Sequence, residues 1–262
     1  LTGDNTYTGD THSNGGVLTI SSDSALRDVN GSIAKIVRVA LGSTNGASLT
    51  GQPLTFTTSV APTSGATGTY NTNSSQQISS LAITDGGSGY TSGVYVSTDK
   101  DNSGTVAGDG NGGIHAIMDS GNIHLNGGTL HVTDTMTLNG ARTIFLAANG
   151  GTFQVDPDKE LTIDGYISSE FSHATVANGY LSVNQIGTDW QPASDRNPDI
   201  GDMIIEGGGT VRLTGAPDGT VRGYQVNNYG GITWINDGTL RISAAGSSAG
   251  GDNGYAGILG TN

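Results

Sequence analysis

The sequence predicts an all-β protein built as a parallel β-helix, a solenoid of short strands, with an inserted β-rich subdomain. Gly accounts for 44 of the 262 residues, well above the average of about 7%. Between turn-forming Gly, Asn, Asp and Ser residues lie short segments in which apolar and polar side chains alternate, as they do in a strand with one buried face. Similar segments also return along the chain, which is typical of solenoids.

A five-residue pattern, Gly-Thr-apolar-polar-apolar, is the clearest of these repeats. It occurs at 128–132, 151–155, 209–213 and 238–242. Each copy predicts a strand that is introduced by a Gly turning the corner. The side chains expected to point inward are Leu130, Val132, Phe153, Val155, Leu161, Ile163, Leu240 and Ile242. Those expected to face solvent are His131, Gln154, Arg212 and Arg241.

Two other architectures compete with the solenoid. Disorder would suit the Gly and Ser content, but regularly spaced β-branched residues argue against it. An antiparallel β-sandwich stays open for residues 121–262, because it needs hairpin turns and Asn-Gly pairs favour them. Such pairs occur at Asn14-Gly15, Asn139-Gly140 and Asn149-Gly150.

A longer repeat relates the two ends of the chain. The opening segment, LTGDNTYTGDTHSNGGVLTIS, returns in looser form over residues 213–243. Asn5, Tyr7, Gly9 and Thr11 match Asn227, Tyr229, Gly231 and Thr233, and Leu18, Ile20 and Ser21 match Leu240, Ile242 and Ser243. The chain is therefore expected to span one long repeat and to enter the next at about residue 213, with the recurring Tyr closing the coil.

These residues resemble the autotransporter passenger-associated repeat, a β-strand repeat of large bacterial surface proteins. The resemblance is carried by Leu1-Thr2-Gly3, Asn5, Tyr7, Gly9, Thr11, Gly15-Gly16, Leu18, Ile20-Ser21-Ser22 and Ala25-Leu26. It implies a right-handed parallel β-helix on the outer surface of a Gram-negative-type bacterium, with a structural or adhesive role. Asp10 departs from the pattern, since it stands where the family usually has a small residue.

Three segments follow from these patterns. Residues 1–31 form the first part of the solenoid, 32–120 an inserted β-sandwich-like subdomain, and 121–262 the solenoid again. Within the insert, residues 32–41 read as a strand or as one short helix. Further strands are expected at 53–60, 78–85, 93–99 and 113–119. Because insertions in repeat proteins often decorate one face, the insert is the expected recognition surface.

Composition excludes several classes of function. The net charge of −13 argues against nucleic acid as a partner. The absence of Cys excludes disulfides, thiolate metal sites and Cys catalysis. No apolar run reaches the roughly 18–20 residues that span a bilayer. No signal-peptide pattern stands at Leu1, which predicts a mature or excised segment.

One loop has the spacing of a calcium site. Asp99, Asp101, Ser103 and Asp109 could supply oxygen ligands in an EF-hand-like arrangement. The twelfth place is Gly110 rather than the bidentate Glu. The missing ligand favours the alternative interpretation, a solvated acidic turn.

Other chemistry-bearing residues are weaker candidates. The five His residues show no metal-binding spacing, so the sequence predicts no zinc site. A loop at 189–199 combines acids with an aromatic residue, as glycan-cleaving sites do, but its Pro and turn residues also describe an ordinary loop. Its members are Asp189, Trp190, Asp195, Arg196 and Asp199. Trp234 is expected to pack against the solenoid.

The expected function is structural, not enzymatic. The chain reads as a repeat or subunit of an extracellular bacterial surface fibre, sheath or giant adhesin. No capping segment is recognisable at Leu1 or at residues 256–260, so the ends are expected to associate, by head-to-tail stacking or as covalent tandem repeats. Surface glycans are a second class of partner. The alternative function is a carbohydrate-binding or polysaccharide-cleaving β-helix protein.

Overall fold

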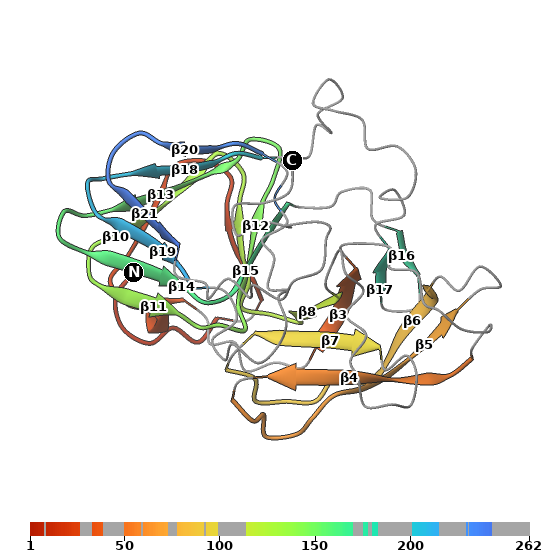
Figure 1. Cartoon of the computed structure of the whole chain (residues 1–262). Helices are drawn as coiled ribbons and strands as arrows, with labels where there is room; N and C mark the ends of the chain where they lie inside the picture. The colour runs from red at the N-terminus through yellow and green to blue at the C-terminus, as the bar shows by residue number, and fades with distance from the viewer. Residues whose placement is uncertain are drawn as a thin grey trace.

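The computed structural model describes residues 1–7, 9–26, 33–38, 50–58, 60–72, 78–91, 93–98, 114–169, 175–177, 180–182, 201–214, 229 and 231–242. Within these ranges the regular secondary structure is almost entirely strand, and the one helix is a 3-10 turn, η1 (Asp23–Ala25). The strands form three parallel sheets and one largely antiparallel sheet, which Figure 1 shows beside each other. The all-β prediction is confirmed.

The first parallel sheet contains β1 (Thr11–Ser13), β9 (Ile123–Leu125), β12 (Thr143–Leu146) and β15 (Tyr166–Ser169), in that order. The second contains β2 (Val17–Ile20), β10 (Gly128–Val132), β13 (Gly151–Val155), β18 (Met203–Glu206) and β20 (Thr233–Ile235). The third contains β11 (Met136–Leu138), β14 (Glu160–Ile163), β19 (Thr210–Leu213) and β21 (Thr239–Ile242).

Consecutive strands of the chain visit these three sheets in turn. Strands β9, β10 and β11 are followed by β12, β13 and β14, so each sheet gains its strands in chain order. Every pairing within the three sheets is parallel. The antiparallel sandwich considered for this part of the chain is therefore wrong for the strands of these three sheets, because its hairpins would give antiparallel pairs.

The three parallel sheets share one apolar core, to which all of them contribute buried side chains. Six of the eight residues expected to point inward are at most 2% exposed: Leu130, Val132, Phe153, Val155, Leu161 and Ile163. In-register pairing explains this burial, since the residue at each inward position packs on its equivalent in the next strand. The other two, Leu240 and Ile242, lie on the terminal strand β21 and are not fully buried.

Paired glycines open two of the strands in the second sheet. In the pair Gly150-Gly151, the first residue has φ +69, which only Gly adopts readily. Gly151 lies outside the left-handed region, but a Cβ there would meet the Leu125 side chain at 2.6 Å. The preceding Gly therefore makes the turn. Gly151 itself is needed because side chains of the first sheet approach too closely for a Cβ.

We expect Gly151→Ala to lower the free energy of unfolding by about 1–3 kcal/mol, the range for overpacking a filled core. Gly65→Ala is a matched control, because a Cβ there meets nothing within 4 Å. Urea titration followed by circular dichroism measures both. Equal midpoints for the two variants would show that the side chains of the first sheet give way without cost.

The fourth sheet is formed mainly by the segment between η1 and β9. Its strands are β3 (Ile33–Arg38), β4 (Gln52–Thr58), β5 (Thr67–Thr72), β6 (Ile78–Asp85), β7 (Val94–Thr98) and β8 (Ile114–Met118). Two later strands, β16 (Thr175–Ala177) and β17 (Tyr180–Ser182), extend it beside β3, giving the order β16-β17-β3-β8-β7-β4-β5-β6. Residues 33–38 are a strand, so the helix considered for this segment is wrong.

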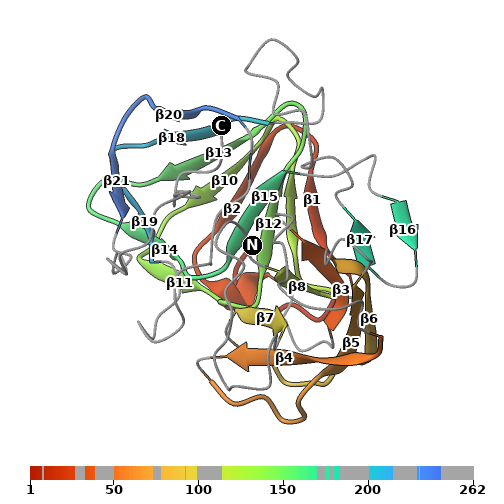
Figure 2. The same ribbon diagram turned by 45° about the vertical axis from the view of Figure 1, so that its right-hand side comes forward.

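A small apolar cluster joins this sheet to the parallel sheets. Leu54, Tyr70, Tyr90 and Met118 are buried together with Ala141, which lies between β11 and β12. Figure 2 shows β4 and β7 below the ends of the parallel strands. The fourth sheet therefore packs on the three parallel sheets through its own core.

The long sequence repeat has a local structural counterpart. The Tyr7 hydroxyl is hydrogen-bonded to the Thr11 hydroxyl, and the Tyr229 hydroxyl lies 2.6 Å from the Thr233 hydroxyl. The first copy, however, continues from β1 in the first sheet to β2 in the second, whereas the later copy continues from β20 in the second sheet to β21 in the third. Both copies of the repeated segment thus form the same local structure, a Tyr–Thr contact followed by two strands joined by a turn. The sheets to which the two strands belong differ between the copies.

Candidate metal centre

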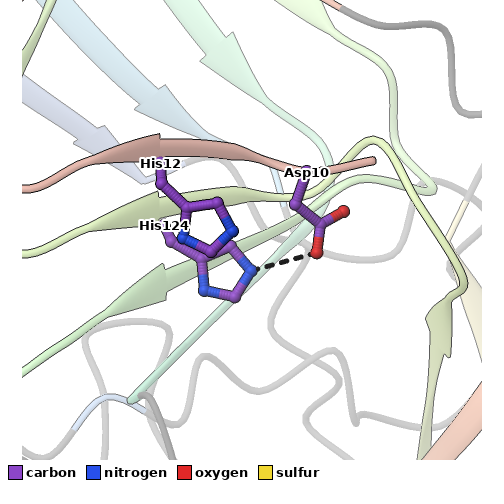
Figure 3. A group of neighbouring side chains, drawn as sticks. All are labelled: Asp10, His12 and His124. Carbon is purple, nitrogen blue, oxygen red and sulfur yellow. Dashed lines mark hydrogen bonds and ion pairs between the residues drawn. The ribbon is translucent and has the colours of Figure 1, made fainter. Parts of the chain in front are cut away.

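Asp10, His12 and His124 gather on the outer side of the first parallel sheet (Figure 3). His12 on β1 and His124 on β9 are direct partners in the parallel register, although 112 residues separate the paired strands. Asp10 comes directly before β1. One potential ligand atom from each of the three residues lies within 4.8 Å of the others. Within the described residues, no other group of three His, Cys, Asp or Glu side chains meets that criterion.

Asp10 is held in place by the segment that returns from the fourth sheet. Its Oδ1 accepts hydrogen bonds from the Asn122 backbone N–H at 2.9 Å and from the Asn122 side-chain amide at 3.1 Å. Its Oδ2 lies 3.1 Å from Nε2 of His124. Each carboxylate oxygen thus has a different partner, and Oδ2 is directed at the imidazole.

Asn122 is itself fixed from two sides. Its side-chain amide also donates to the Met118 carbonyl at 3.1 Å, and its Oδ1 accepts from the Thr143 backbone N–H at 3.2 Å. Asn122 is buried. The amide therefore ties Asp10 to β8 and β12, so the position of Asp10 depends on the packed interior rather than on a surface loop.

The imidazole of His124 is stacked between two rings. The centroid of the His12 ring lies 4.2 Å away with an interplanar angle of 16°. The Phe145 ring, at the paired position on β12, lies at 4.6 Å and 23°. His12 is exposed, whereas His124 and Asp10 are partly buried. The cluster is thus anchored on its inner side and open to solvent on its outer side.

The surroundings of Asp10 favour its charged form. Burial by itself raises the pKa of a carboxyl group, but the hydrogen bonds from His124 and Asn122 outweigh this effect, and the pKa of Asp10 lies below its usual value. A carboxylate beside two imidazoles is a donor set that first-row divalent metals bind.

A second His–Asp pair lies on the second sheet and lacks the third residue. His131 Nε2 is 2.7 Å from Asp156 Oδ1, and the Thr19 hydroxyl lies 3.3 Å from His131 Nδ1. Of the described His, Cys, Asp and Glu side chains, none completes a group of three around this pair. It therefore provides an internal comparison for the Asp10–His12–His124 cluster.

The interpretation of the His residues as unrelated to metal binding rested on spacing within short segments. One further signal in the sequence relates two of these histidines to each other. Residues 12–16 read His-Ser-Asn-Gly-Gly and residues 124–128 read His-Leu-Asn-Gly-Gly. Aligning the two segments pairs His12 with His124, as the parallel register does.

The calcium loop proposed from the sequence lies outside the described residues, because Asp99, Asp101, Ser103 and Asp109 all fall in a range that the structure does not describe. The acidic loop at 189–199, with Trp190, lies outside them as well. Both interpretations stay predictions.

Trp234, which the sequence predicts to pack against the solenoid, lies on β20. Its side chain is 48% exposed. Its indole N–H donates to Oδ2 of Asp202 at 2.8 Å. Trp234 therefore lies on the outer side of the second sheet, paired with the partly exposed Ile204.

Comparisons of the chain with protein families, with curated proteins and with solved structures give no match. The resemblance to the autotransporter repeat therefore stays a prediction. Among the described residues, no helix is long and apolar enough to cross a membrane.

Proposed function

We propose that this chain is a segment of an extracellular structural protein of the bacterial surface, in which the three parallel sheets form a right-handed parallel β-helix that continues end to end with further copies. Its role is to build a fibre, sheath or large adhesin rather than to catalyse a reaction. The order in which the strands visit the sheets supports the β-helix, and the Gly-rich, Cys-free composition supports the surface role. The fourth sheet, which lies beside the three parallel sheets, supplies the surface for partners such as glycans.

The open end of the apolar core carries this proposal. Ile235 continues the inward ladder of Ile205 but is 52% exposed, whereas Ile205 is 0% exposed. Ile242 continues the ladder of Leu213 and is 44% exposed, against 1% for Leu213. Among the described strands, the core thus ends at β20 and β21 with exposed apolar side chains, as it would where another layer of strands belongs.

The opposite end of the parallel sheets is covered on one side. There η1 closes the third sheet, with Ala25 and Leu26 buried against the core. Asn5 holds this turn by donating from its side chain to the Ala25 carbonyl at 2.7 Å. A local closure therefore exists where none was expected from the sequence, but β1 and β2 remain edge strands.

The two ends are different surfaces, so association between them is heterologous and builds filaments rather than closed rings. In such a contact, β20 of one copy lies beside β2 of the next and continues the second sheet. Ile235 then regains the burial that the inward positions have elsewhere in that sheet.

Static light scattering and electron microscopy of the full chain over a concentration series test this proposal. We expect particles that lengthen with concentration. Ile235→Lys should weaken the association at least about tenfold, because it places a charge in the apolar contact. Ile235 is already half exposed, so the variant should stay folded.

Gln154→Lys is the matched control, since Gln154 is partly exposed on β13, between β10 and β18 in the middle of the second sheet and so away from both ends. It adds the same charge and should leave the association unchanged. Monodisperse single chains at every concentration would refute the proposal. Equal effects of the two Lys variants would show that the chains meet elsewhere.

Covalent tandem copies would have a distinct geometry. The first copy of the repeated segment lies in the first and second sheets, and the later copy lies in the second and third. Each successive tandem copy would therefore be rotated about the long axis by the angle between two adjacent sheets. The fourth sheets of successive copies would then project from successive faces of the β-helix, about a third of a turn apart. Electron micrographs of the native material should show these projections in a helical array rather than in a single row.

A further inference from the structure

We propose that Asp10, His12 and His124 bind one divalent transition-metal ion, for which Zn²⁺ is the probe of choice. This site is independent of the proposed fibre function, because it lies within one chain. Its ligands would be one carboxylate oxygen of Asp10 and one imidazole nitrogen from each histidine. Solvent completes the coordination on the open side, where His12 is exposed.

The separation of two of the ligand atoms already suits such an ion. Oδ2 of Asp10 and Nε2 of His124 are 3.1 Å apart. Two ligand atoms about 2.0–2.1 Å from a tetrahedral zinc are roughly 3.3 Å apart. The metal would replace the proton between these two atoms, so their separation needs little change, while the His124 ring turns within its own plane to point its lone pair at the ion.

His12 supplies the third ligand through a rotation of its own side chain. Its ring is stacked on that of His124, and a potential ligand nitrogen lies within 4.8 Å of the other two ligand atoms. Because His12 is exposed, its imidazole can turn toward the ion without displacing packed residues. Loss of the stacking contact is a small cost compared with a metal–nitrogen bond.

The surrounding residues orient the fixed ligands, as outer partners do in established metal sites. Asn122 holds Oδ1 of Asp10 with two hydrogen bonds, which leaves Oδ2 for the ion. Phe145 packs on the inner face of the His124 ring and fixes its plane. Two of the three ligands are therefore preorganised before the metal arrives.

The donor set selects the class of metal. Two imidazoles and one carboxylate suit Zn²⁺ and its neighbours in the first transition row, whereas Ca²⁺ and Mg²⁺ prefer six or more oxygen ligands. A cation there would also offset part of the negative charge of the chain, which is −13 overall.

The bound ion would join two distant parts of the sequence. Asp10 and His12 precede strands β3 to β8 of the fourth sheet in the chain, and His124 follows them. The metal would therefore fasten the edge strand β1 to β9 and stabilise the end of the first sheet. Removal of the metal should loosen β1 first, since among the described strands β1 pairs only with β9.

Isothermal titration of the untagged full chain with Zn²⁺, after treatment with a chelator, tests this inference. We expect one ion per chain and a rise in melting temperature when the ion is bound. His12→Ala should weaken binding at least about 100-fold, because it removes one of three protein ligands. It should also abolish the thermal shift while leaving the metal-free melting temperature nearly unchanged.

His131→Ala is the control, because it removes a His–Asp pair that lies on the second sheet and has no third ligand among the described residues. It should bind Zn²⁺ like the parent chain. Nitrogen-15 NMR of the imidazoles adds a residue-specific measurement, in which Zn²⁺ should shift the His12 and His124 signals and leave His131 in place. No binding by the parent, or binding that survives His12→Ala, would overturn the assignment.

Discussion

Ile163→Asp is expected to unfold the three parallel sheets or to leave them barely stable. Ile163 lies in the third sheet with Leu138 paired on one side and Leu213 on the other. Its side chain is 2% exposed. An aspartate there would place a carboxylate among apolar neighbours, so the expected loss is about 4–5 kcal/mol or more. That is close to the whole stability of many domains, about 5–15 kcal/mol.

Thr137→Asp is the control for this prediction. Thr137 lies on β11 between the buried Met136 and Leu138, but its own side chain is exposed. The variant adds the same charge to the opposite face of the same sheet and should change the stability by about 0.5 kcal/mol or less. Urea titration of both proteins measures the difference. Similar losses in the two variants would mean that the inward and outward faces are assigned wrongly.

Arg142→Met should produce the second large effect. The guanidinium of Arg142 is fully buried, with one amino group 3.1 Å from Oδ1 of Asp23. Its Nε donates to the same oxygen at 3.2 Å, and Nη1 donates to the Gly121 carbonyl. Asp23 belongs to η1, which precedes the strands of the fourth sheet in the chain. Gly121 lies between β8, a strand of that sheet, and β9. Arg142 therefore holds together the two chain segments that lead into and out of strands β3 to β8.

Removal of one partner of a fully buried ion pair costs about 3–5 kcal/mol, because the other partner stays buried without compensation. Asp23 is 25% exposed and can be solvated in part, so we expect a loss at the lower end of this range for Arg142→Met, measured by thermal and urea unfolding. Lys159→Met is the matched control, since Lys159 pairs with Asp134 at 3.0 Å on the surface. An exposed pair contributes about 1 kcal/mol or less. Equal losses in the two variants would contradict a structural role for Arg142.

Much of the parallel sheets could be predicted from local patterns. Alternating side chains predicted the buried face of β10, β13 and β14, and the structure confirms Leu130, Phe153 and Ile163 in the core. Residues with β-branched side chains between turn formers predicted strands throughout. These features depend on neighbours within a few residues, so a single short segment contains the information.

The candidate metal centre could not be predicted in the same way. His12 and His124 have no notable spacing in the sequence, and only the parallel register of β1 with β9 brings them together. Arg142 is a similar case, because its buried role depends on Asp23 and Gly121, which reach it through the packing of separate segments. Neither residue type carries a local signal for such a role.

The sequence alone determined that this chain forms short strands joined by glycine turns, and which side of most strands is apolar, because sterics and burial act within each strand. The tertiary structure decided which strands are neighbours. Two similar segments, around Tyr7 and Tyr229, occupy different pairs of sheets. Their sequences are alike, but the strands with which they pair differ. Strand pairing across long intervening segments depends on how the whole chain packs, and that packing is what creates the cluster of Asp10, His12 and His124.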